Sequence, residues 1–162
     1  MTKKGATAKT ADGVRMIAQN KKARFDYQVE DRFEAGLALS GSEVKSLRAG
    51  NVSLSDAYAQ PKGTDLVLVN CRIGEYQPAA FFGHPPLRER KLLLHRAEIE
   101  KIRGKVEQRG YTLVPLAIYF KAGWAKVELA LAKGRTHEDR RDAIAERETK
   151  REMDRAMSRK RR

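Results

Sequence analysis

Cysteine is nearly absent from this sequence, because Cys71 is the only one in 162 residues. A single thiol excludes an internal disulfide and favours a reducing compartment, most simply the cytoplasm. No apolar run is long enough to cross a bilayer, and no apolar segment follows the first lysines, so we expect no membrane association and no secretory signal. Hydrophobic residues make up 41% of the chain. That is enough for a modest core, so one domain with extensions is expected.

Residues that usually carry catalysis are also sparse. The three histidines, His84, His95 and His137, form no recognisable metal-ligand spacing with the single cysteine. The sequence contains neither a glycine-rich phosphate loop nor a serine in a nucleophile elbow. The pattern therefore predicts no metal, no cofactor and no enzymatic activity.

Positive charge is what the chain has in abundance. Lysine and arginine total 34 against 21 acidic residues, a net charge of +13. Residues 1–24 carry a net +6, residues 25–132 a net +2, and residues 133–162 a net +5. A nearly neutral body between two basic arms is typical of a protein that binds a polyanion. Neither arm has an apolar face for a membrane, so nucleic acid is the favoured partner.

The body has the periodicity of strands. Apolar residues alternate from Tyr27 to Leu39, which predicts a strand, and Gly36 within it indicates a bend or a close backbone approach. Two hairpins are predicted, one where residues 52–60 and 65–73 flank the turn PKGT, and one where residues 111–120 and 124–132 flank KAG. Pro115 in the second hairpin indicates an edge strand or a bulge.

Two short helices are predicted between these strands. Ser40 and Glu43 have the spacing of a capping box, and Gly50 can end the first helix. The second helix would bury one face, made of Ile99, Ile102 and Val106. About six strands with two or three short helices predict a mainly β fold, namely an OB-like closed antiparallel barrel. A β-sandwich would produce the same pattern.

The apolar alternation stops after Ala132. The remaining residues include many good helix formers but only a thin apolar stripe, made of Ala143, Ile144, Met153, Ala156 and Met157. We therefore expect residues 134–162 to be a flexible basic tail that is disordered alone and becomes helical against a polyanionic wall. Residues 1–16 are expected to be a flexible basic arm, which leaves residues 17–133 as the RNA-binding barrel.

The sequence contains four separated strings that resemble, in order, the small protein B (SmpB) family, the SsrA-binding proteins of bacterial trans-translation. They are AQNKKAR from Ala18, FEAGLALSGSEVKSLRAGNVSLSDAYA from Phe33, LRERKLLLH from Leu87 and GYTLVPLAIYFKAGWAKVELALAKG from Gly110. The resemblance implies a barrel that binds the tRNA-like domain of tmRNA and brings tmRNA to stalled ribosomes. It also implies a tail that becomes helical on the ribosome, in the decoding centre and the empty mRNA channel. Elongation factor Tu with alanyl-tmRNA is implied in the delivery complex.

The resemblance assigns RNA binding to a set of residues in the body, namely Asn20, Lys21, Lys22, Arg24, Glu34, Leu93 and Lys126. Asn20 and the basic residues after it would offer amide and cationic donors. Glu34 could accept hydrogen bonds from base amino groups or 2′-hydroxyls, or hold a neighbouring arginine, although by pattern alone it is a surface residue. Leu93 is by pattern alone a core residue. Lys126 lies on the polar side of its strand and suits a phosphate contact.

The resemblance assigns the decoding centre to residues of the tail, namely Gly134, Arg135, His137, Asp139, Arg140 and Arg141. The family often has a histidine or an aromatic residue immediately before the aspartate. This chain has Glu138 there, with His137 one residue earlier. Either His137 supplies the planar side chain after a one-residue adjustment, or that contact is absent.

Two other functions stay open at this point. A generic OB-fold RNA-binding or ribosomal protein without a rescue role would lose RNA affinity with its tail, and would show no separate ribosomal defect. An RNA-processing enzyme would need a positioned base, a nucleophile or a metal site, and the sequence shows none of these.

Overall fold

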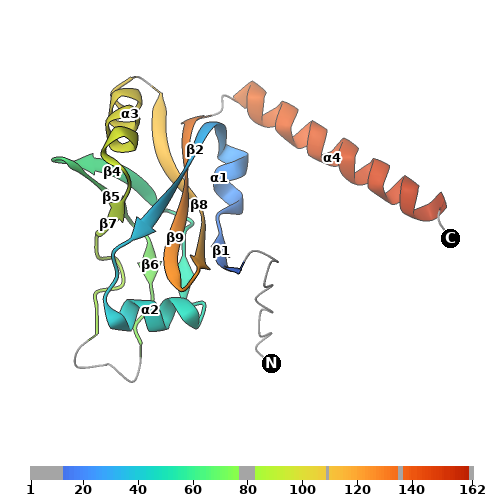
Figure 1. Cartoon of the computed structure of the whole chain (residues 1–162). Helices are drawn as coiled ribbons and strands as arrows, with labels where there is room; N and C mark the ends of the chain where they lie inside the picture. Colours follow the sequence, from blue (N-terminus) through green and yellow to red (C-terminus); the bar gives the residue numbers. More distant parts are fainter. Residues whose placement is uncertain (1–12, 77–82, 109, 135–136, 161–162) are drawn as a thin grey trace.

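The computed structural model describes residues 13–76, 83–108, 110–134 and 137–160, and within them the side chains of residues 137–140 are not described. Strands predominate in the body of the molecule, and helices lie around them (Figure 1). None of the described helices is long and apolar enough to span a membrane.

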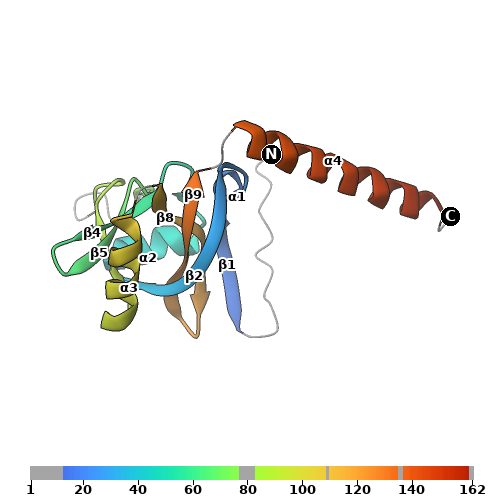
Figure 2. The ribbon, with the colours of Figure 1, turned by 90° about the horizontal axis from the view of Figure 1, so that it is seen from above.

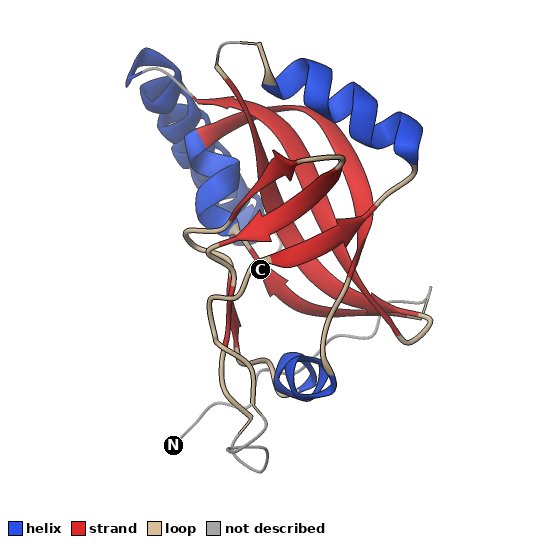
Figure 3. Cartoon of the chain, turned by 90° about the vertical axis from the view of Figure 1, so that its left-hand side faces the viewer, coloured by secondary structure: helices blue, strands red, loops and turns tan. Residues whose placement is uncertain are grey.

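Six antiparallel strands close into a ring, which Figure 3 shows as strands curving around a common centre. Their order is β8 (Tyr111–Lys121), β4 (Tyr58–Lys62), β5 (Asp65–Val69), β7 (Arg90–Leu93), β2 (Tyr27–Leu37) and β9 (Trp124–Gly134), which pairs again with β8. This closure confirms the predicted OB-like antiparallel arrangement and distinguishes it from a sandwich. The outer strand β1 (Val14–Gln19) pairs with the second half of β8, and β3 (Val52–Ser53) pairs with β6 (Arg72–Ile73) in a separate small sheet.

The main core fills the interior of the ring. Strand β2 buries Phe33, Ala35 and Leu37, which confirms the predicted alternation. Helix α3 (Arg96–Val106) lies at one end of the ring and buries Ile102, while α2 (Gly41–Arg48) lies at the other end and buries Leu47 (Figure 1, Figure 3). Burial of these apolar side chains is the dominant favourable term in folding.

Short sequence motifs correctly predicted several helix ends and strand irregularities. The backbone N–H of Ser40 donates to Glu43 Oε1 at 3.3 Å, so the predicted capping contact is confirmed. Gly50, with a φ of +78°, follows the end of α2, as glycine can without a steric penalty. The register between β8 and β9 shifts after Pro115, which confirms a bulge there. A Cβ on Gly36 would lie 3.2 Å from the Leu93 Cβ, so the close approach is confirmed as well.

A second apolar cluster lies outside the ring. Helix α1 (Lys21–Asp26) packs Ala23 against Val114 and Leu116 of β8. Strand β8 is consequently buried on both faces, which explains why its sequence is a continuous apolar run. Strands β1 and β7 and helix α1 were not predicted from the sequence pattern. Strand β1 begins at Val14, inside the range expected to be an arm, and residues 1–12 of that arm lie outside the described residues.

Helix α4 (His137–Lys160) projects away from the body (Figure 1, Figure 2). Its apolar residues Ile144, Met153 and Met157 are exposed, which confirms that the thin stripe does not join the core. The first turns of α4 lie near α1, and the rest of the helix extends beyond the ring. The disorder of this segment in the free protein stays a prediction.

Candidate nucleic-acid interface

Three of the expected RNA-binding residues come together on the outer face of the ring. Gly36 of β2 pairs with Lys126 of β9 on one side and with Leu93 of β7 on the other. Directly paired residues share one face of a sheet, so Leu93 and Lys126 flank Gly36. Glu34 lies two residues before Gly36 and is therefore on the same face. We call this set, with the side chains that contact it, the outer patch: Arg32, Glu34, Leu93, Tyr119, Lys121, Lys126 and Glu128.

Leu93 does not belong to the core. Its side chain is 52% exposed, whereas Leu92 next to it is buried. Strand β7 points Arg90 and Leu92 inward, so the alternation turns Leu93 outward. The core expectation was wrong because three consecutive leucines cannot show which of them faces solvent. Leu93 lies instead on the surface that the family resemblance indicates.

The carboxylate of Glu34 is held by two neighbours on β8. It accepts a hydrogen bond from the hydroxyl of Tyr119, and Lys121 Nζ lies 3.5 Å from its Oε1. The hydrogen bond from Tyr119 is the main reason why the pKa of Glu34 lies below its ordinary value, with Lys121 and Lys126 adding to the effect. Burial, and then the same carboxylate, raises the pKa of Tyr119. Glu34 is thus an ionised acceptor at a fixed position, suited to a base amino group or a 2′-hydroxyl.

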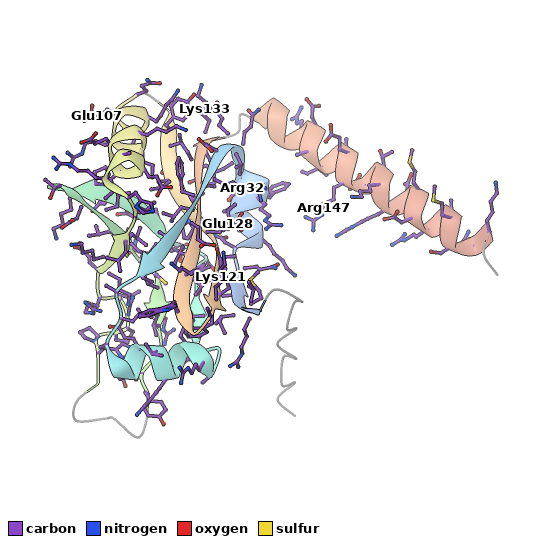
Figure 4. The ribbon with its side chains drawn as sticks, in the orientation of Figure 1. Arg32, Glu107, Lys121, Glu128, Lys133 and Arg147 are labelled. Carbon is purple, nitrogen blue, oxygen red and sulfur yellow. The ribbon has the colours of Figure 1, made fainter. Side chains whose placement is uncertain are left out.

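A second carboxylate of the outer patch is neutralised separately. Glu128 lies directly opposite Glu34 in the ladder, and Arg32 Nη1 is 3.0 Å from Glu128 Oε1. Figure 4 labels Arg32 of β2, Glu128 of β9 and Lys121 of β8 one below another on the body of the molecule. Among the described residues, no carboxylate forms an ion pair with Lys126 within 4.0 Å. The Lys126 ammonium is therefore available to a phosphate.

The basic residues of α1 form a second group, and Lys21, Lys22 and Arg24 are exposed on it. Asn20, the N-cap of α1, is only 5% exposed. Its Oδ1 accepts from the Ala23 N–H at 3.1 Å, and its Nδ2 donates to the carbonyls of Leu54 at 3.0 Å and Pro115 at 3.1 Å. The expected amide donor to RNA is therefore already used within the protein. Asn20 positions the three cations of α1 instead.

The expected decoding-centre residues begin where β9 ends. Gly134 is the last residue of β9, and Arg141 is exposed on α4. Arg135 lies outside the described residues, and so do the side chains of His137, Asp139 and Arg140. The first turns of α4 and helix α1 line a shared hollow, whose basic residues are Lys21, Arg24, Arg147 and Lys150.

A buried ion cluster, which no sequence motif indicated, joins β7 to α2. The carboxylate of Glu43 accepts hydrogen bonds from Arg88 Nε at 3.1 Å and from Arg90. Arg90 also donates to the carbonyls of Cys71 at 2.6 Å and Pro86 at 3.2 Å. Burial alone would raise the pKa of Glu43, but the hydrogen bonds from Arg90 and Arg88 outweigh it and lower the pKa to about 2. The cluster ties β7, and so Leu93, to α2.

His84 strengthens the same region. It lies outside the helices and strands, yet it is buried. His84 Nε2 lies 3.0 Å from the carbonyl of Ile73, and Nδ1 lies 2.9 Å from the hydroxyl of Ser42 on α2. Since a carbonyl can only accept, Nε2 carries the proton and Nδ1 accepts from Ser42. The role of His84 in the described structure is to hold this loop against α2.

Known proteins resemble the chain over most of its length. The sequence model of the family described as SmpB protein matches residues 17–159. An SsrA-binding protein of Anaeromyxobacter sp. (strain Fw109-5) is 69% identical over 158 residues, which covers 98% of this chain and 96% of that protein. The SsrA-binding protein of Myxococcus xanthus (strain DK1622) is 63% identical over 148 residues, covering 91% of each chain.

A solved structure is similar in fold as well as in sequence. It is described as "tmRNA-SmpB: a journey to the center of the bacterial ribosome". The matching chain is 45% identical, with a TM-score of 0.64, and the match covers 78% of this chain and 93% of that one. The likeness therefore extends from the sequence motifs to the three-dimensional arrangement.

Proposed function

The chain belongs to the SmpB family, and from this premise we propose that it binds tmRNA and delivers it to stalled ribosomes for trans-translation. In that process the ribosome is rescued and the incomplete peptide is tagged. The observation that carries the proposal is the family match over residues 17–159, together with 69% identity to an SsrA-binding protein over nearly all of both chains. The role is that of an RNA-binding protein and not of an enzyme.

The tRNA-like domain of tmRNA is the part that the ring would bind. The outer patch offers a fixed carboxylate acceptor on Glu34, an exposed apolar side chain on Leu93 and, on Lys126, an ammonium with no ion pair among the described residues. These groups suit hydroxyl, base and phosphate contacts respectively. The cations of α1 would add contacts to the RNA backbone, and counterion release would strengthen the binding.

The tail would act on the small ribosomal subunit. Residues 133–162 carry a net charge of +5, and the side chains described on α4 are nearly all exposed as the helix leaves the ring. A basic helix without a buried face is suited to a channel lined by RNA phosphates. We assign the decoding centre to Gly134, Arg135, His137, Asp139, Arg140 and Arg141, and the empty mRNA channel to the rest of α4. Alanyl-tmRNA with elongation factor Tu completes the delivery complex, in the cytoplasm, where ribosomes translate.

The test is to sequence the RNA that co-purifies with the tagged full-length protein. We expect one dominant tRNA-like RNA, and we expect the same preparation to support peptide tagging on a message that lacks a stop codon. A matched Glu34→Ala, Lys126→Ala double variant should lose most of that RNA, since it removes two expected contacts and leaves the net charge of the chain unchanged. A broad mixture of ribosomal and messenger fragments would indicate a generic RNA-binding protein instead.

A further inference from the structure

Trp124 is the only tryptophan in the chain, and its side chain is 72% exposed. It begins β9 directly after a tight turn, in which Ala122 and Gly123 have φ values of 51° and 82°. Among the described residues, no hydrogen bond or ring contact to the Trp124 side chain is present. A large indole left in solvent forgoes the burial that aromatic side chains usually gain. A binding role would account for this exposure.

The indole lies at the edge of an apolar hollow of about 450 Å³. Strands β2, β7, β8 and β9 and helix α2 all contribute to this hollow, through residues that include Gly36, Leu39, Val44, Leu93, Phe120 and Trp124. We call it the Trp124 hollow. Its volume falls in the range of pockets that hold small-molecule ligands. Gly36 keeps this region open, because a Cβ there would approach the Leu93 Cβ to 3.2 Å.

Cations surround this apolar surface. Lys126 lines the hollow, and Lys121 pairs directly with Trp124 at the end of the hairpin. The guanidinium carbon of Arg48 lies 5.7 Å from the centroid of the ring of Phe120, which also lines the hollow. An uncharged lipid or apolar peptide would give no partner to the ammonium of Lys126, for which the described residues supply no ion pair. An RNA duplex would offer phosphates but no accessible base face, since its bases are stacked inside the helix.

The occupant that satisfies both the aromatic wall and the cations is an unpaired nucleotide. We propose that the Trp124 hollow binds one unstacked nucleobase of the bound RNA, with the indole of Trp124 stacked on the base and Lys126 on an adjacent phosphate. Leu93 supplies the apolar wall, which gives a physical reason for its exposure. Stacking on an aromatic ring tolerates any base, because every base has a π face. This inference rests on the proposed function, since it needs RNA at the outer patch.

Intrinsic fluorescence tests the contact directly, because Trp124 is the only indole. The full-length protein is titrated with the tRNA-like domain of tmRNA, with a single-stranded oligoadenylate, and with an RNA duplex of equal length. We expect the first two RNAs to quench the fluorescence and the duplex to leave it nearly unchanged. Trp124→Ala should weaken binding of the tRNA-like domain on the order of tenfold, with no change in the slope of affinity against salt.

Two further variants serve as controls. Trp124→Phe should retain most of the affinity, because the phenyl ring can still stack. Leu87→Ala should bind as the unchanged protein does, since Leu87 is 58% exposed and is not part of the hollow. The proposal would be overturned if Trp124→Ala lost thermal stability as well as affinity, because the effect would then be structural. It would also be overturned if the slope of affinity against salt concentration became smaller, because the lost contact would then be electrostatic.

The remaining outcomes separate this inference from the proposed function. If the unchanged protein binds the tRNA-like domain but Trp124→Ala binds it equally well, the stacking contact is refuted and tmRNA binding stands. If oligoadenylate quenches the fluorescence but the tRNA-like domain is not bound, the hollow accepts a base and the proposed function fails. Normal RNA affinity of Trp124→Ala with a loss of peptide tagging would overturn the inference in favour of a protein partner.

Discussion

The hydroxyl of Tyr119 on β8 donates a hydrogen bond to the carboxylate of Glu34 on β2, across the intervening strand β9. The two residues are separated by 85 positions in the sequence. The contact makes Tyr119 a positioning residue for a carboxylate that is expected to accept hydrogen bonds from RNA. It also keeps the pKa of Glu34 below its ordinary value.

Replacement of Tyr119 by phenylalanine should raise the pKa of Glu34 toward its ordinary value, because the largest lowering contribution is removed. Affinity for tmRNA should fall several-fold, in line with about 1 kcal/mol for one hydrogen bond. Carbon-detected NMR titration would measure the pKa, and filter binding the affinity. If Tyr119→Phe binds normally while Glu34→Ala is defective, Tyr119 does not position the carboxylate.

Lys126→Ala should reduce the dependence of tmRNA affinity on salt by about one unit of logarithmic slope, because one phosphate contact is lost. The measurement is the dissociation constant across a series of salt concentrations. Lys62→Ala is a suitable control. Lys62 lies at the end of β4, and its Nζ forms an ion pair with Oε2 of Glu89 at 2.7 Å. An unchanged slope for Lys126→Ala would remove this lysine from the phosphate contacts.

The buried Glu43 should make the protein sensitive to acid. Its pKa is about 2 in the folded state against an ordinary 4.5, so its stabilisation is fully present above about pH 4.5 and is lost progressively as the pH falls toward 2. Glu43→Gln should cost about 3–5 kcal/mol at neutral pH, because Arg90 is left buried without its partner. Its stability should also depend less on pH over this range. Thermal unfolding between pH 6 and pH 3 would detect both effects, and equal acid dependence of the two proteins would contradict the assignment.

Removal of the tail should separate RNA binding from ribosome function. A chain that ends at Lys133 should still fold, because the core residues precede it, and it should keep most of its tmRNA affinity. Peptide tagging should fail, since nothing would enter the decoding centre. Replacement of Asp139, Arg140 and Arg141 by alanine leaves most of the tail in place. This variant should also keep its tmRNA affinity and lose peptide tagging. Normal peptide tagging by the shortened chain would exclude the decoding role. Loss of tmRNA binding together with tagging would contradict the assignment of these two functions to the ring and the tail.

Amide hydrogen exchange in the free protein should separate the ring from the tail. We expect strong protection in the strands β2, β8 and β9, whose backbone groups pair within the ring. We expect little protection from Ile144 to Met157, because an isolated exposed helix gains almost nothing from tertiary packing. Strong protection across that segment in the monomer would show that α4 is stable without the ribosome.

The sequence by itself determined the features that depend on neighbours along the chain. Alternation predicted strand β2, Ser40 and Glu43 predicted the start of α2, and Pro115 predicted a bulge. These features rest on the strand period and on hydrogen bonds between residues a few positions apart, so a single sequence contains the whole signal. The motifs that resemble the SmpB family and the two basic arms indicated RNA binding in the same direct way.

The tertiary structure decided which groups face outward and which are already occupied. Closure of the ring turned Leu93 into solvent, brought Lys126 beside Gly36, and placed Tyr119 against Glu34. It also enclosed the side chain of Asn20, whose two amide donors go to carbonyls 34 and 95 positions away. Contacts over such separations depend on strand register and ring closure, which no local pattern encodes. For this reason the same sequence that predicted the fold could not show that Trp124 would remain exposed above an apolar hollow.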